Sequence, residues 1–170
     1  MFFFQAGNFP ALVHAGVSLN YARIAPCGLV DPHMHPRASS IVYVAKGEFL
    51  TGFFLENGID YVTNTVHEGQ AVVFPQGSVH FELNTGCTEA VFIAARSNED
   101  PGSLVATAFM KQFQANVVAA ALGDASENQV PAQVNALPDF PSQNVRDCLL
   151  RCAKKDSEGP KKKDDHSKHH

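Results

Sequence analysis

The strongest constraint on the fold is a series of short β-type segments that turn signals separate and that no helical pattern interrupts. Each segment is rich in Val, Ile, Phe, Tyr and Thr, the residues that strands favour. The segments are 17–25, 40–46, 48–55, 59–66, 71–74, 79–83 and 89–95. Glycine-containing turns such as Lys46-Gly47 and Pro75-Gln76-Gly77 lie between them. This spacing predicts an all-β, antiparallel sandwich or barrel rather than alternating strands and helices.

The apolar pattern takes a helical period after Pro101-Gly102. Helices are expected over 103–110, 113–122, 126–133 and 142–153. In the last of these, Cys148 and Cys152 share one helix face with Val145 and Leu149, because the four residues fall at i, i+3, i+4 and i+7. Both cysteines therefore lie on the apolar face. We therefore predict a barrel over 1–100 and a C-terminal helical extension of the same domain over 101–153. A disordered tail rich in Lys, Asp and His is expected over 154–170.

Length and charge narrow the function classes. The 170 residues, 45% of them hydrophobic, suffice for one domain with a sizeable core. Before residue 153 the chain carries seven Lys and Arg against thirteen Asp and Glu, which argues against nucleic acid as a partner. No apolar run approaches the roughly 20 residues that cross a bilayer, so no membrane-spanning role is expected.

The N-terminus lacks the basic start and long apolar run of a secretory signal peptide. Either the chain is cytosolic or a leader has been removed. The apolar segment 2–4 is interpreted as a strand of a truncated N-terminus.

Four cysteines, Cys27, Cys87, Cys148 and Cys152, permit two disulfides. We predict disulfides rather than buried thiols, because small secreted domains use such bridges. Two arrangements remain open. Either both bridges run from the last helix to the barrel, or Cys27 bonds Cys87 and a strained bridge joins Cys148 to Cys152.

Two segments concentrate metal-binding side chains. His33 and His35 lie two residues apart in an extended segment, so both imidazoles share one face. His80 begins a later strand. Imidazole is a common metal ligand, although a His-x-His pair alone is a weak signal.

These segments resemble the motifs of the cupin superfamily. The second motif, Gly-x5-Pro-x-Gly-x2-His-x3-Asn, is matched by Gly69, Pro75, Gly77, His80 and Asn84. The closer resemblance is to germins and to the spherulin-like proteins of fungi and slime moulds, through 32–38, 74–77 and 98–102. The resemblance implies a jelly-roll-like cupin β-barrel with C-terminal helices, commonly a homo-oligomer, and an extracellular location. It also implies one metal ion per chain, with His33, His35 and His80 as ligands.

One position departs from this pattern. The fourth ligand of the family, a Glu five residues after the second His, falls on Ser40. Two interpretations remain open: a degenerate storage, stress or structural cupin, or a site with a changed metal and chemistry. We favour the second. A neutral set of imidazoles suits copper, so copper is expected first and manganese or iron second.

The expected function is a metal-dependent oxidase acting on a small carboxylate such as formate or oxalate. O2 would be reduced to hydrogen peroxide and CO2 released. The alternatives are superoxide dismutation, an activity associated with some germins, and a barrel without turnover. The expected partners are the small carboxylate and O2.

Glu82 is the predicted catalytic residue. It lies two residues after His80, so in a strand both side chains point into the same cavity. Germins of the oxalate-oxidising type commonly carry Gln at this place. The alternative is that Glu82 turns outward through a bulge or is neutralised by Arg96 or Arg23.

Overall fold

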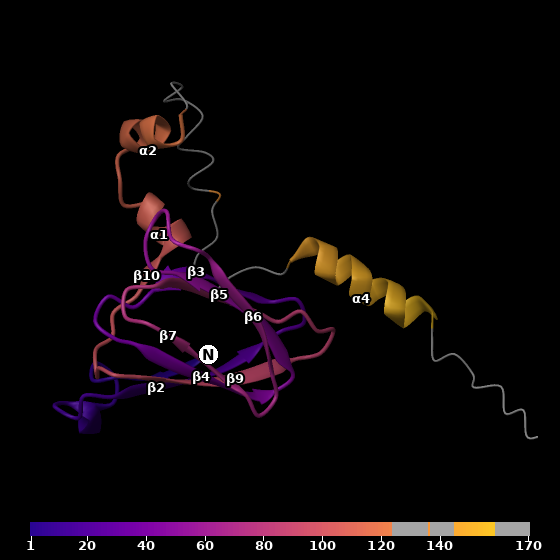
Figure 1. Cartoon of the computed structure of the whole chain (residues 1–170), viewed down its shortest axis with the longest axis horizontal. Coiled ribbons are helices and arrows are strands. Elements are labelled where there is room, and N and C mark those ends of the chain that lie inside the picture. Colours follow the sequence, from indigo (N-terminus) through magenta and orange to yellow (C-terminus); the bar gives the residue numbers. More distant parts are fainter. Residues whose placement is uncertain (124–135, 137–144, 159–170) are drawn as a thin grey trace, which may run out of the picture.

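A computed structural model describes residues 1–123, 136 and 145–158, and two five-stranded antiparallel sheets form its body (Figure 1). The first sheet has the order β1-β2-β9-β4-β7 and the second the order β10-β3-β8-β5-β6. The strands are β1 (Phe2–Phe4), β2 (Ser18–Ile24), β3 (Leu29–Met34), β4 (Ser40–Lys46), β5 (Glu48–Phe54), β6 (Val62–His67), β7 (Ala71–Phe74), β8 (Val79–Leu83), β9 (Ala90–Arg96) and β10 (Leu104–Val105). The predicted all-β, antiparallel fold with C-terminal helices is confirmed.

Alternation along the strands places the core between the sheets. In β4, Val42 and Val44 are buried, whereas Ile41 and Tyr43 are exposed on the outer face. Phe49 of the second sheet meets Phe92 of the first edge to face, with ring centroids 5.3 Å apart. Burial of these aliphatic and aromatic side chains is the main favourable contribution to packing of the two sheets.

Two strands differ from the sequence prediction. The prediction assigned no strand to β3, where Asp31 and Pro32 are poor strand formers and the pairing register shifts between Val30 and His33. Leu104 and Val105, expected in a helix, instead form β10 against β3. The helical pattern of this segment is therefore overridden by long-range pairing, and the sheet extends past residue 100.

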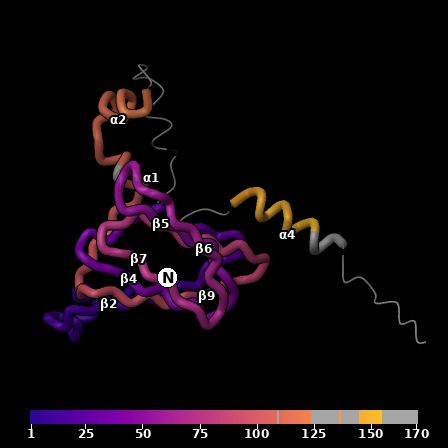
Figure 2. The backbone as a smooth tube through the Cα atoms, viewed as in Figure 1, coloured from indigo at the N-terminus to yellow at the C-terminus, as the bar shows by residue number. Residues whose placement is uncertain are grey.

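The described helices are η1 (Pro10–Leu12), α1 (Ala106–Met110), α2 (Ala115–Ala121) and α4 (Arg146–Glu158). Figure 2 traces the chain from the strands into α1 and α2. The predicted helix over 126–133 lies outside the described residues. Among the helices that the structure describes, none is long and apolar enough to cross a bilayer.

The last helix continues beyond its predicted end. The tail was expected to be disordered from Lys154, but α4 extends to Glu158, so this expectation is wrong for 154–158. Lys and Glu are good helix formers, and adding them to an existing helix is easier than starting one. Residues 159–170 lie outside the described part of the chain. The division into 1–100, 101–153 and 154–170 stays a prediction.

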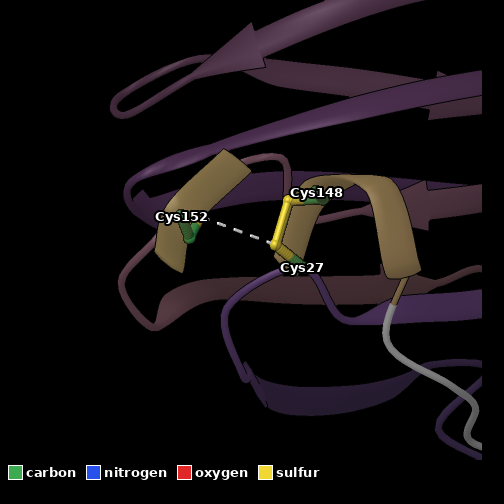
Figure 3. A group of neighbouring side chains, drawn as sticks. All are labelled: Cys27, Cys148 and Cys152. Atoms are coloured by element: carbon green, nitrogen blue, oxygen red, sulfur yellow. Dashed lines mark hydrogen bonds between the residues drawn. A yellow bond between two sulfur atoms is a disulfide. The ribbon is translucent and has the colours of Figure 1, made fainter. Parts of the chain in front are cut away.

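Two disulfides fasten α4 to one end of the sandwich. Cys27 bonds Cys148 and Cys87 bonds Cys152, and Figure 3 shows the first bond with Cys152 beside it. Bridges between helix and barrel were one of the two predicted arrangements, and this arrangement is confirmed. Cys27 lies between β2 and β3, and Cys87 lies between β8 and β9. Both therefore sit in connections that join the two sheets.

Candidate metal centre and its cavity

Neighbouring strands bring three buried imidazoles together. His33 belongs to β3, His35 follows the end of that strand, and His80 belongs to β8. His33 and His80 are direct partners in the antiparallel pairing of these strands. One ligand atom from each of the three rings lies within 4.8 Å of the others. The structure thus places all three predicted ligands where one metal ion could be held.

Backbone carbonyls fix the tautomer of each ring. Nδ1 of His33 lies 2.8 Å from the Asp31 oxygen, and Nδ1 of His80 lies 2.9 Å from the Ser78 oxygen. Nδ1 of His35 lies 2.6 Å from the oxygen of Gly102. A carbonyl only accepts, so each Nδ1–H donates and the lone pair of each neutral ring is on Nε2. Three oriented lone-pair donors fit a transition-metal ion.

Burial keeps the rings neutral. It lowers the pKa of His33 well below its ordinary value, that of His35 to about 3 and that of His80 to about 4. The positive charge of Arg96 opposes protonation of all three. Since metal ligation requires the unprotonated ring, the site is prepared for an ion at physiological pH. Phe74 stacks on His80 at 4.3 Å and restricts its orientation.

A cavity of about 390 Å³ lies between the two sheets, lined on one side by His33, His35 and Glu82 and on the other by Asn20 and Arg96. His80 and Ser40 are buried beside these residues and do not themselves line it. We call the inward side chains His33, His35, His80 and Glu82 the histidine wall; they come from β3, the residue after it, and β8 in the second sheet. We call the inward side chains Asn20, Ser40 and Arg96 of the first sheet the arginine wall. All seven side chains are buried.

Glu82 points inward, and only 3% of it is exposed. This geometry rules out the outward orientation considered above. Burial raises the pKa of Glu82 to about 7, while the nearby Arg96 acts in the opposite direction. Arg23 is not its partner, because Arg23 binds Glu89 at the surface with N–O distances of 2.9 to 3.0 Å.

Asn20 was not predicted as a member of the site, and Arg96 was predicted only in the alternative in which it neutralises Glu82. Arg96 lies beside Ser40 in the pairing of β4 with β9, and its Nη1 donates to Oδ1 of Asn20. The sequence did carry a signal for Arg96. Ala90, Phe92 and Ala94 form the inward face of β9, so extending that strand by one residue places Arg96 on the same face.

Several buried polar atoms of the two walls lack hydrogen-bond partners in the described part of the chain. They are Nε2 of His35, Oε2 of Glu82, Oγ of Ser40 and Nε of Arg96. Buried polar groups are normally paired, and unpaired ones are costly. Their concentration on the two walls indicates that polar ligands complete this cavity.

A second group of candidate ligand atoms is excluded as a metal site. The sulfurs of Cys27, Cys148 and Cys152 lie within 4.8 Å of one another. Each of these cysteines is bonded in a disulfide, so no thiolate is available to a metal.

Residues 2–130 match the sequence profile of the family described as Cupin. Spherulin-1B of Physarum polycephalum is 39% identical over 145 residues, which are 85% of this chain and 58% of that protein. Germin-like protein subfamily 1 member 4 of Arabidopsis thaliana is 41% identical over 100 residues, 58% of this chain and 45% of that protein. This chain thus spans less than two thirds of the length of these relatives.

A solved structure described as recombinant oxalate oxidase in complex with glycolate shares the fold. Its TM-score is 0.73 at 29% identity, and the match covers 80% of this chain and 70% of that one. The predicted resemblance to cupins, germins and spherulins is therefore confirmed, and so is the fold.

Proposed function

Since this chain belongs to the cupin family, we propose that His33, His35 and His80 hold one transition-metal ion and that the adjoining cavity oxidises a small carboxylate. The observation that carries the proposal is the buried triad, whose ligand atoms lie within 4.8 Å of one another beside the inward carboxyl of Glu82. The likeness to oxalate oxidase supports the same class of substrate.

Copper is the metal we propose first, with manganese or iron second. The carboxylate ligand of the family pattern is replaced by Ser40, so the protein ligands are neutral imidazoles. Imidazole suits copper, whereas manganese favours oxygen ligands, and copper leads the intrinsic affinity order of divalent ions. When bound, the ion supplies the redox exchange between the carboxylate and O2.

The proposed reaction balances with O2 as the oxidant. Formate and one proton react with O2 to give CO2 and hydrogen peroxide. Oxalate and two protons react with O2 to give two molecules of CO2 and hydrogen peroxide. In each case two electrons leave the acid through cleavage of its C–H or C–C bond and reduce O2.

The side chains around the cavity have separate tasks. Oε2 of Glu82 is buried and has no hydrogen-bond partner among the described residues, so we assign it to carry a proton to or from the bound reactants. Phe92, Val30 and Val105 line the cavity with apolar surface and limit its water content. Glu82 is thus the proposed catalytic residue.

Metal analysis followed by product analysis tests the function. The full chain is purified without added metal and then loaded with Cu²⁺, Mn²⁺ or Fe²⁺, and peroxide and CO2 are measured with formate and with oxalate. We expect the copper form to release equal amounts of peroxide and CO2 from formate. Superoxide consumption without acid oxidation would instead support a dismutase, and no metal uptake would support a non-catalytic barrel.

Two features of the structure bear on the location and the oligomeric state that we propose. Disulfides are typical of oxidising compartments, so we propose an extracellular location.

The outer face of the first sheet exposes Ile41, Tyr43 and Val73. Because contiguous apolar surface favours association, we propose a homo-oligomer, which light scattering of the purified chain would test.

A further inference from the structure

The arginine wall contains a buried cation, Arg96, which is not one of the proposed metal ligands. We propose that Arg96 anchors the carboxylate group of the ligand in the cavity that it lines together with Asn20 and Glu82. This inference rests on the proposed function, because it names the group that holds the acid to be oxidised. It adds a binding residue on the sheet opposite the proposed metal ligands.

Arg96 is buried, and none of the ion pairs found among the described residues includes it. Only 9% of its surface is exposed, and its Nε has no hydrogen-bond partner among the described residues. Glu82 lies near enough to interact electrostatically, yet no hydrogen bond joins the two side chains in the described structure. A buried charge is costly unless it is paired and hydrogen-bonded. The cavity therefore favours an anion that supplies this pairing.

Asn20 presents Arg96 in a defined orientation. Oδ1 of the buried Asn20 accepts a hydrogen bond from Nη1 of Arg96. The edge of the guanidinium formed by Nε and Nη2 is a separate edge, and it matches the two oxygens of a carboxylate. With Nη1 engaged and Nε without a partner, this edge is the one assigned to the ligand.

Ser40 explains why the carboxylate comes from outside the protein. Ser40 and Arg96 are direct partners in the pairing of β4 with β9. A Glu at position 40 would place a carboxylate beside this guanidinium, whereas the short serine hydroxyl does not reach an acceptor or donor in the described structure. Position 40 thus supplies no carboxylate to pair with Arg96. A small carboxylate supplies what the serine lacks.

Calorimetric titration with glycolate tests the anchor directly, without relying on turnover. The metal-loaded full chain is compared with Arg96→Gln, and glycolamide serves as the neutral probe of similar shape. We expect Arg96→Gln to weaken glycolate binding by roughly tenfold or more, because charge-assisted, bidentate hydrogen bonds are lost. Its metal content should equal that of the parent. The matched control is Arg23→Gln, since Arg23 pairs with Glu89 at the surface; its glycolate affinity should not change.

Two further comparisons keep the test decisive. Arg96→Lys retains the charge but loses the planar fork, so we expect at least about fivefold weaker glycolate binding even if the Gln variant does not fold. Unchanged glycolate affinity in a folded Arg96 variant, or no glycolate binding by the parent, would overturn the anchor. A parent that binds glycolate through Arg96 but oxidises no acid would instead refute the proposed function alone.

Discussion

The two walls of the cavity are built in different ways. On the histidine wall each imidazole has one nitrogen held by a backbone carbonyl, so the other nitrogen is directed for ligation. On the arginine wall the side chains come from β2, β4 and β9, and Nε of Arg96 and Oγ of Ser40 have no partners in the described structure. Backbone carbonyls orient the histidine wall, whereas the side chain of Asn20 orients Arg96 on the arginine wall.

The walls also differ in charge. Burial keeps the three imidazoles neutral, whereas Arg96 stays positive because its lowered pKa is still about 10. The neutral imidazoles accept a metal cation without repulsion, and the positive charge of Arg96 attracts an anion. We therefore expect that removing an imidazole mainly affects metal binding and that removing the Arg96 charge mainly affects carboxylate binding.

Removing one imidazole from the histidine wall should have the largest effect on metal binding and oxidation. His80→Ala removes one proposed ligand, so we expect metal affinity to fall by at least about 100-fold and oxidation to be lost. Elemental analysis of the purified chain, with residues 159–170 deleted to remove their histidines, measures the metal. His67→Ala is the matched control, since His67 lies near Glu48 at the surface. A full equivalent of metal in His80→Ala would contradict the assignment.

Changing the proton carrier of the same wall tests chemistry without changing the metal. Glu82→Gln preserves the size of the side chain but cannot exchange the carboxyl proton. We expect roughly 10²-fold slower turnover with metal occupancy unchanged. The steady-state rate of peroxide release measures the effect, and Glu89→Gln serves as the surface control because Glu89 pairs with Arg23. Turnover of the Glu82 variant at the parent rate would remove Glu82 from the mechanism.

The disulfides test whether the two walls depend on α4. Replacing Cys87 and Cys152 together by Ser opens one bridge and leaves the bond between Cys27 and Cys148. We expect the free energy of unfolding to fall by about 2–4 kcal/mol, mainly because the unfolded chain gains freedom. Denaturant titration measures the loss. Metal occupancy should persist in the folded variant; an unchanged unfolding midpoint would show that this bridge does not stabilise the fold.

The smallest of these effects is expected for Ser40→Glu, which adds a carboxylate to the arginine wall. A carboxylate at this position pairs with Arg96 and competes with the external acid, so we expect about tenfold weaker glycolate binding. It also adds the oxygen ligand that manganese favours, so Mn²⁺ affinity should rise. Thr65→Glu, which adds a carboxylate at an exposed position of β6, is the control and should change neither quantity. Equal glycolate affinity in Ser40→Glu would show that Arg96 does not hold the acid.

Most residues of the histidine wall could be predicted from the local sequence. The two-residue spacing of His33 and His35 follows from strand periodicity, and the motif around His80 gave its place. The same periodicity correctly placed Glu82 inside. The predicted strands omitted β3, because Asp31 and Pro32 weaken the local signal, although His33 and His35 were expected in an extended segment. Pairing with β8 holds this segment extended.

The amino-acid sequence by itself determined the all-β pattern, the histidine motifs and the replacement at Ser40. Tertiary structure decided which cysteines bond, that Leu104 and Val105 form a strand, and that Arg96 shares a cavity with Glu82. The physical reason is the range of the interactions. Side-chain alternation is a property of a few neighbouring residues, whereas the cavity is formed only when two sheets, whose strands are far apart in the chain, pack face to face.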